Sequence, residues 1–252
     1  MKISIITATY NSAKTLNVCM DSVLNQTYRD IEYLIIDGNS TDATVDLIKA
    51  KAAAHPHIVW VSGKDKGIYD ALNKGIEKAT GDVIGFVHSD DFLADSTIVE
   101  KIASVFNTQQ VDGVYGNLHY VKFDAPGTIV RNWVSQPFRK ALLNRGWMPA
   151  HPTLFLKKSV YQNHGVFDLT YKIAADYDFI LRVFSNPGYK FFYLPETFTK
   201  MRVGGASNRS IKNLILKSKE DYRAAKSNGL PRPLFSVIFK NISKIPQWLS
   251  KS

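Results

Sequence analysis

The stretch DVIGFVHSDDF, residues 82–92, combines the pattern of a buried strand with a charged end. Its apolar run, residues 83–87, stops at two adjacent carboxylates, Asp90 and Asp91. Neighbouring carboxylates repel each other, so a positive group is expected beside them. A solvated turn would account for the pair, and so would a site for a divalent cation.

Length and charge narrow the classes of protein to consider. A chain of 252 residues with 45% hydrophobic content suits one large globular domain, or one domain with an appendage. A net charge of +10 favours anionic partners, which include nucleic acid, phosphorylated small molecules and acidic membrane surfaces. The single cysteine, Cys19, excludes an internal disulfide, fits a reducing compartment and suits a small buried position on a helix.

Neither a signal peptide nor a membrane span is expected. The chain passes from Met1 and Lys2 directly into a strand-like run, without a cleavage site of small residues. It contains no apolar run of about 18 residues. We therefore expect a cytoplasmic protein, either soluble or peripheral on the inner face of the membrane.

Strand-like and helix-like segments alternate along the first 92 residues. Strands are predicted at 3–10, 31–37, 58–63 and 82–88, with helices at 13–26, 44–54 and 67–80. This alternation predicts an α/β fold with a mostly parallel sheet covered on both faces. The turn after the first strand, TATYNS at 7–12, has no glycine. That excludes the dinucleotide-binding Rossmann fingerprint and the P-loop.

Each predicted strand ends in polar residues. Because ligands of open α/β sheets bind at the carboxyl ends of the strands, we expect Asn11, Asp37, Asp65 and Asp91 around one crevice. The neighbouring polar residues in 39–42 could instead cap the next helix.

Four motifs in this order resemble the family 2 glycosyltransferases with a GT-A fold. They are ISIITATYNSAKTL (3–16), IIDGNSTDAT (35–44), DKGIYDALNKGI (65–76) and SDDF (89–92), and the resemblance covers residues 1–205. It implies a Rossmann-like central sheet flanked by helices. The composition changes from residue 206, which predicts a helical C-terminal extension at 206–252. The implied activity is that of bacterial enzymes that move a sugar, of hexosyltransferase type, from a nucleotide diphosphate sugar, most directly a UDP-sugar. The closest likeness is to enzymes of cell-surface polysaccharides such as colanic acid and O-antigen.

The resemblance also implies the residues that hold the nucleotide sugar. Asp37 corresponds to the acid that accepts a hydrogen bond from the ring N–H of the base. Asp70 and Asn73 lie one helical turn apart in the third motif, where exposed polar residues of a helix are the alternative. The full implied set is Thr7, Tyr10, Asn11, Asp37, Asp65, Asn73, Asp90 and Arg202.

The SDD sequence at 89–91 falls where the family carries its D-x-D signature. Ser89 replaces the first aspartate, whereas Asp91, the usual metal contact, is present. Mg²⁺ or Mn²⁺ fits one or two carboxylates completed by diphosphate oxygens. The implied role of the metal is to stabilise the departing nucleotide diphosphate.

Residues 113–200 are expected to form the acceptor side. Strands at 113–121 and 128–134 would pair as a hairpin. His151 is expected on a strand near the diphosphate or the acceptor. Asp176, at the start of a helix, matches the general base of an inverting reaction, although capping of that helix is the alternative. Arg202 would reach the diphosphate, and Gly204 and Gly205 would permit a mobile lid.

The C-terminal segment predicts two helices. The first, 211–228, would end at Gly229, and the second would carry the apolar stripe Leu234, Ile238, Ile242 and Ile245, with Lys240 and Lys244 elsewhere. Such a basic amphipathic helix suits a membrane interface, and a lipid-linked saccharide acceptor would explain it. The alternatives are packing on the catalytic domain or on a second copy in a homodimer.

Two other functions compete with glycosyl transfer. A metal-dependent nucleotidyltransferase would need a basic, glycine-rich loop after the first strand, which residues 7–12 lack. A catalytically inactive module that binds a nucleotide or glycan would not need Asp176. Nucleic-acid binding is disfavoured because no strand or helix interleaves basic and aromatic residues.

Overall fold

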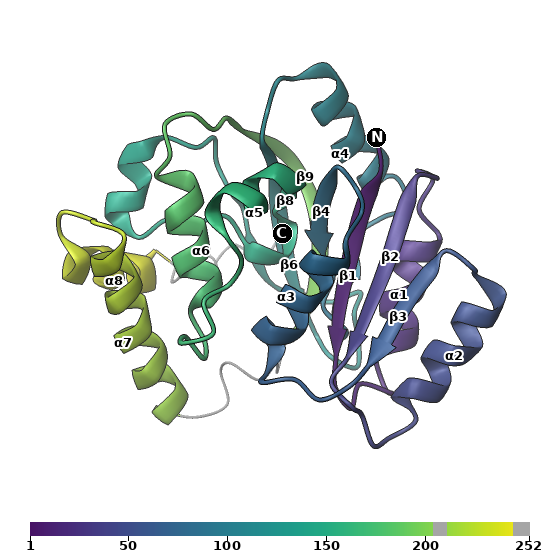
Figure 1. The fold of residues 1–252 in the computed structure, drawn as a ribbon. Helices are drawn as coiled ribbons and strands as arrows, with labels where there is room; N and C mark the ends of the chain where they lie inside the picture. Colours follow the sequence, from purple (N-terminus) through teal and green to yellow (C-terminus); the bar gives the residue numbers. More distant parts are fainter. Residues whose placement is uncertain (204–210, 244–252) are drawn as a thin grey trace.

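One mixed sheet with helices on both faces organises the residues that the computed structural model describes, 1–203 and 211–243 (Figure 1). The strand order is β3-β2-β1-β4-β8-β6-β9-β5, with β7 paired to β6. The strands are β1 Ile3–Thr9, β2 Ile31–Asp37, β3 Ile58–Ser62, β4 Val83–Phe86, β5 Phe92–Leu93, β6 Gly113–Val121, β7 Ile129–Trp133, β8 Phe155–Lys157 and β9 Phe191–Arg202.

The first four strands form the parallel half of the sheet, as predicted. In its register Thr9 lies opposite Asp37, and Asp37 lies opposite Ser62. The carboxyl ends of β1, β2 and β3 therefore lie level, and the loops that follow them meet at one edge.

The second half of the sheet is mixed in direction. β8 runs antiparallel to β4 and β6, and β6 pairs with β9 in parallel. The hairpin of β6 and β7 is confirmed. β5 pairs antiparallel with the end of β9, with Phe92 opposite Lys200, so residues close to 200 return beside the SDD sequence.

Two hydrophobic cores lie on opposite faces of the sheet. Because side chains alternate along a strand, Ile5 of β1 faces one core and Ile6 the other. Helices α1, α2 and α4 cover the face of Ile5, and α3, α5, α6 and α7 pack over the face of Ile6. The helices are α1 Leu16–Leu24, α2 Thr44–Ala54, α3 Ile68–Lys78, α4 Ile98–Thr108, α5 Lys158–His164, α6 Ala175–Phe184, α7 Ile211–Ser227 and α8 Pro233–Ile242, with short 3-10 turns η1 Lys140–Arg145 and η2 His151–Thr153.

The two predicted C-terminal helices are present as α7 and α8. Gly229 has φ +70° and follows the end of α7, as expected for a left-handed residue after a helix. Ala224, Ala225 and Leu230 belong to the same core as α6, so α7 packs directly on the α/β body. The predicted boundary at 205, with Gly204 and Gly205, lies outside the described residues and stays a prediction.

The orientation of α8 contradicts the alternative in which its apolar stripe packs on the catalytic domain. Leu234, Ile238 and Ile242 are exposed, whereas Lys240 is buried. The lysine turns inward because it meets a buried carboxylate, that of Asp221 on α7. Ile245 and Lys244 lie outside the described residues. None of the described helices is long and apolar enough to cross a membrane.

Candidate active site

The loops after β1 and β2 are tied to each other at the carboxyl edge of the sheet. Asn11 Oδ1 accepts a hydrogen bond from Thr41 N at 2.8 Å, and Asn11 N donates to Ser40 Oγ at 2.8 Å. Asn11 and Asn39 have φ of 49° and 66°. This left-handed conformation is uncommon for residues other than glycine, and asparagine is one of the few residues that tolerate it well. The two loops therefore form a defined rim rather than loose connections.

Asp37 is buried at the end of β2 and organises the loop that follows it. Its Oδ2 accepts hydrogen bonds from Asn39 N and Ser40 N, both at 3.1 Å, and from Ser62 Oγ at 2.5 Å. Its Oδ1 accepts from Ser40 Oγ at 2.5 Å. A contact from Asp37 to a nucleobase stays a prediction, and Oδ1, which accepts from Ser40 Oγ, has a second lone pair for it.

Tyr10, Gly38 and Asp65 converge on one point of the rim. A Cβ atom on Gly38 would lie 2.6 Å from Asp65 Oδ2 and 3.5 Å from Tyr10 Cδ2. Tyr10 is exposed, and Asp65 Oδ1 accepts from Gly67 N at 3.0 Å. Glycine at 38 thus allows the carboxylate to approach the backbone, while the Tyr10 ring is free to cover a ligand.

Thr7 does not reach this crevice. It lies within β1 and is fully buried. Its hydroxyl donates to Val87 O at 2.7 Å and lies 3.0 Å from Tyr33 Oη. The prediction that Thr7 holds the nucleotide is therefore wrong: the side chain faces the core under α1 and links β1 to the end of β4.

Asn73 is likewise committed to the protein itself. Its Nδ2 donates to Phe167 O at 2.9 Å, and its Oδ1 accepts from Phe167 N at 3.0 Å. This reciprocal pair fixes a segment 94 residues away in sequence, so Asn73 is not brought to the nucleotide side as predicted. Asp70 pairs with Lys74 at 3.1 Å and accepts from Lys66 N at 3.0 Å, which fits the alternative of a polar helix residue.

Asp90, Asp91 and Arg202 come together where the end of β9 meets the residues just before β5. Arg202 N donates to Asp91 Oδ1 at 3.1 Å, and Arg202 Nη1 donates to Asp90 O at 2.6 Å. The Arg202 guanidinium also lies 5.0 Å from the centre of the Phe92 ring. Burial and the charge of Asp90 hold the pKa of Asp91 well above its usual range, against the lowering effect of Arg202.

The acidic pair fits a cation that is completed by the ligand. Asp91 Oδ2 is buried and has no hydrogen-bond partner among the described residues. Within the same residues no group of three His, Cys, Asp or Glu side chains could enclose a metal ion. An open set of one or two carboxylates is what Mg²⁺ uses when substrate phosphates supply further oxygens. Ser89 stands at the position of the missing aspartate, and its hydroxyl oxygen lies 2.9 Å from that of Ser12. This hydrogen bond links the segment after β4 to the loop after β1.

His151 lies in the 3-10 turn η2, not in a strand as expected. It is 9% exposed, its ring stacks on Phe86 with centroids 5.3 Å apart, and its centroid lies 5.7 Å from that of His88. Neither ring nitrogen has a partner among the described residues. Burial lowers the pKa of His151 to about 4, against the opposing charge of Asp176, so the ring is neutral at pH 7.

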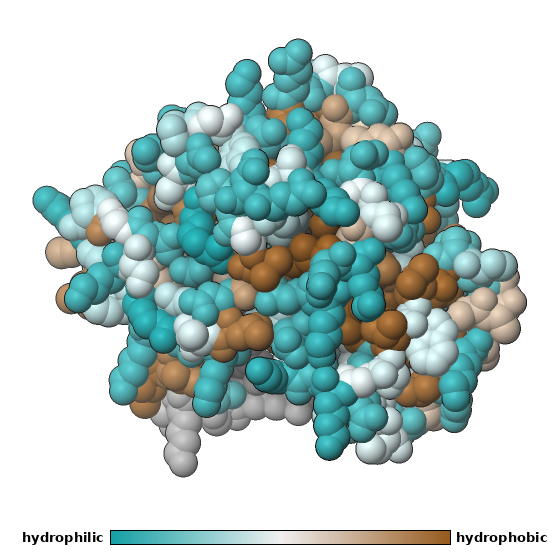
Figure 2. All heavy atoms as spheres, viewed as in Figure 1, coloured by the Kyte–Doolittle hydropathy of each residue, from teal (hydrophilic) through white to brown (hydrophobic). Residues whose placement is uncertain are grey.

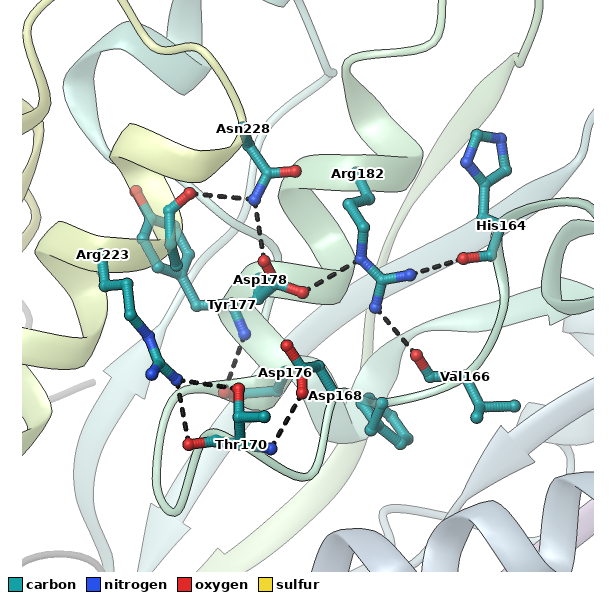
Figure 3. A network of polar contacts seen from close by, with 12 residues as sticks. His164, Val166, Asp168, Thr170, Asp176, Tyr177, Asp178, Arg182, Arg223 and Asn228 are labelled. Carbon is teal, nitrogen blue, oxygen red and sulfur yellow. Dashed lines mark hydrogen bonds and ion pairs between the residues drawn. The ribbon is translucent and has the colours of Figure 1, made fainter.

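Two carboxylates lie in the first turn of α6, and they have different surroundings (Figure 3). Asp178 is buried; its Oδ2 accepts from Arg182 Nε at 3.0 Å and its Oδ1 from Asn228 Nδ2 at 2.8 Å. Asp176 is half-buried, and its Oδ1 accepts from Tyr177 N at 2.8 Å and from Tyr69 Oη at 3.3 Å. Asp178 is therefore structural, and the role of Asp176 as the base stays a prediction.

The charges of Asp176 and of the SDD sequence act on the same two rings, those of His88 and Tyr120. Burial lowers the pKa of His88, and the charges of both Asp90 and Asp176 oppose that shift. The pKa of Tyr120 depends on both Asp91 and Asp176. Burial raises this pKa, Arg131 lowers it, and the charges of the two carboxylates raise it further. The ring of His88, after β4, and the ring of Tyr120, on β6, are thus each within electrostatic range of Asp176 and of one aspartate of the acidic pair.

Two residues of this site were not predicted from the sequence. Tyr69 lies inside the third motif, and its hydroxyl donates to Ile173 O at 2.6 Å as well as to Asp176. Glu220 of α7 is buried and accepts hydrogen bonds from three successive backbone N–H groups, 172–174, directly before α6. The motif could have indicated Tyr69, but nothing local in the chain marks Glu220.

Comparison with known proteins agrees with this arrangement. Residues 4–167 match the family described as Glycosyl transferase family 2. A PGL/p-HBAD biosynthesis glycosyltransferase of Mycobacterium tuberculosis is 30% identical over 219 residues, which are 85% of this chain and 82% of that protein.

Solved structures of low sequence identity share the fold. Staphylococcus aureus TarS 1-349 in complex with UDP-GlcNAc has a TM-score of 0.74 at 17% identity, covering 96% of this chain and 73% of that chain. The mannosyltransferase PcManGT of Pyrobaculum calidifontis, in complex with GDP-Man and Mn²⁺, has a TM-score of 0.68 at 17% identity, covering 99% and 73%.

Proposed function

Since the chain belongs to glycosyl transferase family 2, we propose that it is an inverting glycosyltransferase that moves a sugar from a UDP-sugar to a saccharide acceptor. The observation that carries this proposal is the placing of Asp176. It is a first-turn carboxylate of α6 whose charge acts on His151 and His88, two rings with centroids 5.7 Å apart, and His88 also lies within the field of Asp90. Its neighbour Asp178 is instead hydrogen-bonded to Arg182 and Asn228.

Asp176 is proposed to take the proton from the attacking hydroxyl of the acceptor. A base within hydrogen-bond reach of that hydroxyl is required, and the N-terminal turn of a helix favours its ionised form. Because the hydroxyl attacks from the face opposite the leaving nucleotide diphosphate, the anomeric carbon is inverted. Tyr69 and the neutral ring of His151 would help to orient the carboxylate and the reacting sugar.

The rim of Tyr10, Asn11, Asp37 and Asp65 is proposed to hold the nucleotide. Tyr10 would cover the base, while Asp37 or Asp65 would accept from its ring N–H. The choice of UDP is supported by the TarS complex with UDP-GlcNAc, and the PcManGT complex with GDP-Man makes GDP the alternative to test.

A divalent cation, Mg²⁺ or Mn²⁺, is proposed to be held by Asp91 with Asp90 beside it. The buried, unpartnered Oδ2 of Asp91 supports this, as does the Mn²⁺ in PcManGT. When bound, the cation supplies Lewis-acid stabilisation of charge on the departing diphosphate. Arg202 is the chain's own cation at this point, and it would bind a diphosphate oxygen or close over the acidic pair.

A lipid-linked saccharide is proposed as the acceptor, in the synthesis of a bacterial surface polysaccharide. It would place the enzyme in the cytoplasm, in peripheral contact with the inner face of the membrane. A homodimer is compatible with this placing and is tested by light scattering.

Calorimetry and an activity assay together test the proposed function. UDP, GDP and dTDP are titrated with and without Mn²⁺ into the wild type, Asp91→Asn and Asp176→Asn. We expect one nucleotide to bind with metal, Asp91→Asn to abolish the metal effect, and Asp176→Asn to bind the donor normally while transfer falls at least a thousandfold.

Three results would remove parts of this proposal. Metal-independent binding that survives Asp91→Asn would exclude the cation at the SDD sequence. Full transfer by Asp176→Asn would exclude it as the base, and binding without any turnover in the wild type would favour an inactive module. Asp46→Asn, an exposed aspartate on α2, is the matched control and is expected to change neither readout.

A further inference from the structure

Helices α7 and α8 expose a set of large apolar side chains. Leu214 is 59% exposed and Leu234 is 61% exposed, and both line a groove of about 440 Å³ together with Tyr222. Figure 2 shows apolar surface at the lower end of α7. The members of this set, named here the α7–α8 apolar face, are Leu214, Ile215, Tyr222, Leu234, Phe235, Ile238, Phe239 and Ile242.

The exposure of this face does not come from loose packing of the helices. The opposite side of α8 is anchored by Lys240, whose Nζ lies 2.7 Å from Asp221 Oδ1 and 3.3 Å from the centre of the Tyr177 ring. Ser236 Oγ donates to Asn144 O at 2.8 Å. The polar side of α8 thus faces the protein and its apolar side faces outward, which is the reverse of an ordinary surface helix.

The charges around the face have one sign. In residues 213–243 the carboxylates are Glu220 and Asp221, and both are buried and hydrogen-bonded inside the protein. The exposed charged side chains of the same residues are Lys219, Arg223, Lys226 and Arg232. An apolar surface whose own helices, within residues 213–243, expose cations and no carboxylate suits a partner that is both apolar and anionic.

We propose that the α7–α8 apolar face docks on a membrane surface that contains anionic lipids. Phe235, Phe239 and the leucines would enter the boundary between headgroups and acyl chains, while Lys219 and Arg232 would meet lipid phosphates. A bilayer satisfies both features of the face at once. A second copy of the chain would instead bring the same cations opposite one another, with no exposed carboxylate of the face to meet them.

This inference identifies the surface for the membrane contact of the proposed function. It rests on the proposed function for the lipid-linked acceptor that would explain such a contact, whereas the exposed apolar side chains and the cations of α7 and α8 support it independently. The helices of the face also hold the proposed base: Glu220 of α7 binds the backbone before α6, and Lys240 of α8 contacts Tyr177, the residue after Asp176. Docking would therefore orient the crevice of Asp176 relative to the lipid surface.

The test is sedimentation of the full chain with vesicles of phosphatidylcholine, alone or mixed with phosphatidylglycerol. One variant, Phe235→Ser/Phe239→Ser, shortens the apolar face, and another, Lys219→Glu/Arg232→Glu, reverses its charge. The matched control Lys49→Glu/Lys78→Glu makes the same charge change at exposed sites on α2 and α3. Circular dichroism and nucleotide binding check that each variant is folded.

Binding to the mixed vesicles at low salt is expected, with little binding to phosphatidylcholine alone. Each basic residue near an anionic surface is worth about 1 kcal/mol, so the charge reversal should weaken binding at least tenfold. The phenylalanine variant should also lose at least tenfold in affinity for the mixed vesicles. The control should lose less than about threefold, because salt screens charges that lie far from the bilayer.

Three outcomes would overturn the proposal. Equal loss in the control would mean that net charge alone attracts the protein. Vesicle binding unchanged by the phenylalanine variant would mean that another surface docks. A wild type that is dimeric by light scattering, does not bind vesicles and becomes monomeric in the phenylalanine variant would assign the face to a second copy. Since Asp176→Asn should bind vesicles like the wild type, failure of the proposed catalysis leaves this test intact.

Discussion

Glu220 is expected to hold the proposed base in position from a different helix, and Glu220→Gln tests this. The carboxylate accepts from Lys172 N at 3.0 and 3.2 Å, from Ile173 N at 2.8 Å and from Ala174 N at 3.0 Å, and it is 7% exposed. These are the donors directly before α6, whose first turn carries Asp176. The hydrogen bonds are charge-assisted, each contributing about 1.5–3 kcal/mol.

The size of the effect follows from this geometry. Glutamine keeps one oxygen for Ile173 and Ala174 but turns an NH₂ group toward the N–H of Lys172 and removes the charge. We therefore expect a loss of about 2 kcal/mol in the free energy of unfolding, and about 4 kcal/mol for Glu220→Ala, which leaves three backbone donors, two part-buried and one buried, without this acceptor. Since a 1 Å displacement of a catalytic group can cost about a hundredfold in rate, kcat should fall ten- to a hundredfold for Gln.

The assay measures denaturant unfolding, donor affinity by calorimetry, and kcat with saturating donor and acceptor. Donor affinity should not change, because the rim of β1 and β2 lies on other elements. Glu77→Gln, at an exposed position of α3, is the matched control. The reasoning is refuted if Glu220→Gln loses stability but keeps full kcat, since the contact would then be structural only, or if it behaves like the control.

Three further predictions concern neighbouring contacts. Lys240→Met should lower the free energy of unfolding by about 2 kcal/mol, because it removes one of the two lysines that pair with the buried Asp221, while Lys217 keeps its contact at 2.8 Å; a loss under about 1 kcal/mol in denaturant unfolding contradicts this. His151 has a folded-state pKa of about 4 against an ordinary value of 6.5, so the unfolded chain binds more protons between these values. Stability from His151 is therefore complete above about pH 6.5 and falls by up to about 3 kcal/mol as pH drops toward 4, and His151→Asn should flatten the measured pH profile in that window. Tyr69→Phe should cost about 1 kcal/mol of stability and lower kcat severalfold without changing donor affinity; an unchanged kcat would mean that the hydroxyl serves only Ile173.

Much of the fold was predictable from short-range pattern. The strands and helices of the first 92 residues follow the predicted ranges closely, and the parallel half of the sheet, the β6–β7 hairpin and helix α7 ending before Gly229 are confirmed. The membership of glycosyl transferase family 2 is confirmed as well. These features depend on periodicity and turn residues, which each segment carries within itself.

Two of the predicted nucleotide contacts fail for reasons of side-chain direction. Thr7 shares the face of Ile3 and Ile5, because alternate residues of a strand point the same way, and that face is covered by α1. Strand alternation could have revealed this. Asn73 faces Phe167, and only the packing of distant segments brings that partner to it.

By itself the sequence determined the order of the elements, the edge of the sheet where polar residues collect, and the candidate carboxylates Asp91 and Asp176. Only the tertiary structure decided that Asp178 is structural, that Glu220 supports the start of α6, and that Lys240 turns inward while the apolar stripe of α8 faces out. The physical reason is the range of the interactions. Periodicity depends on residues a few positions apart in the sequence. The orientation of a buried charged side chain depends instead on a partner that only folding brings close: Glu220 and Ala174 are 46 residues apart in the sequence, and Lys240 and Asp221 are 19 apart.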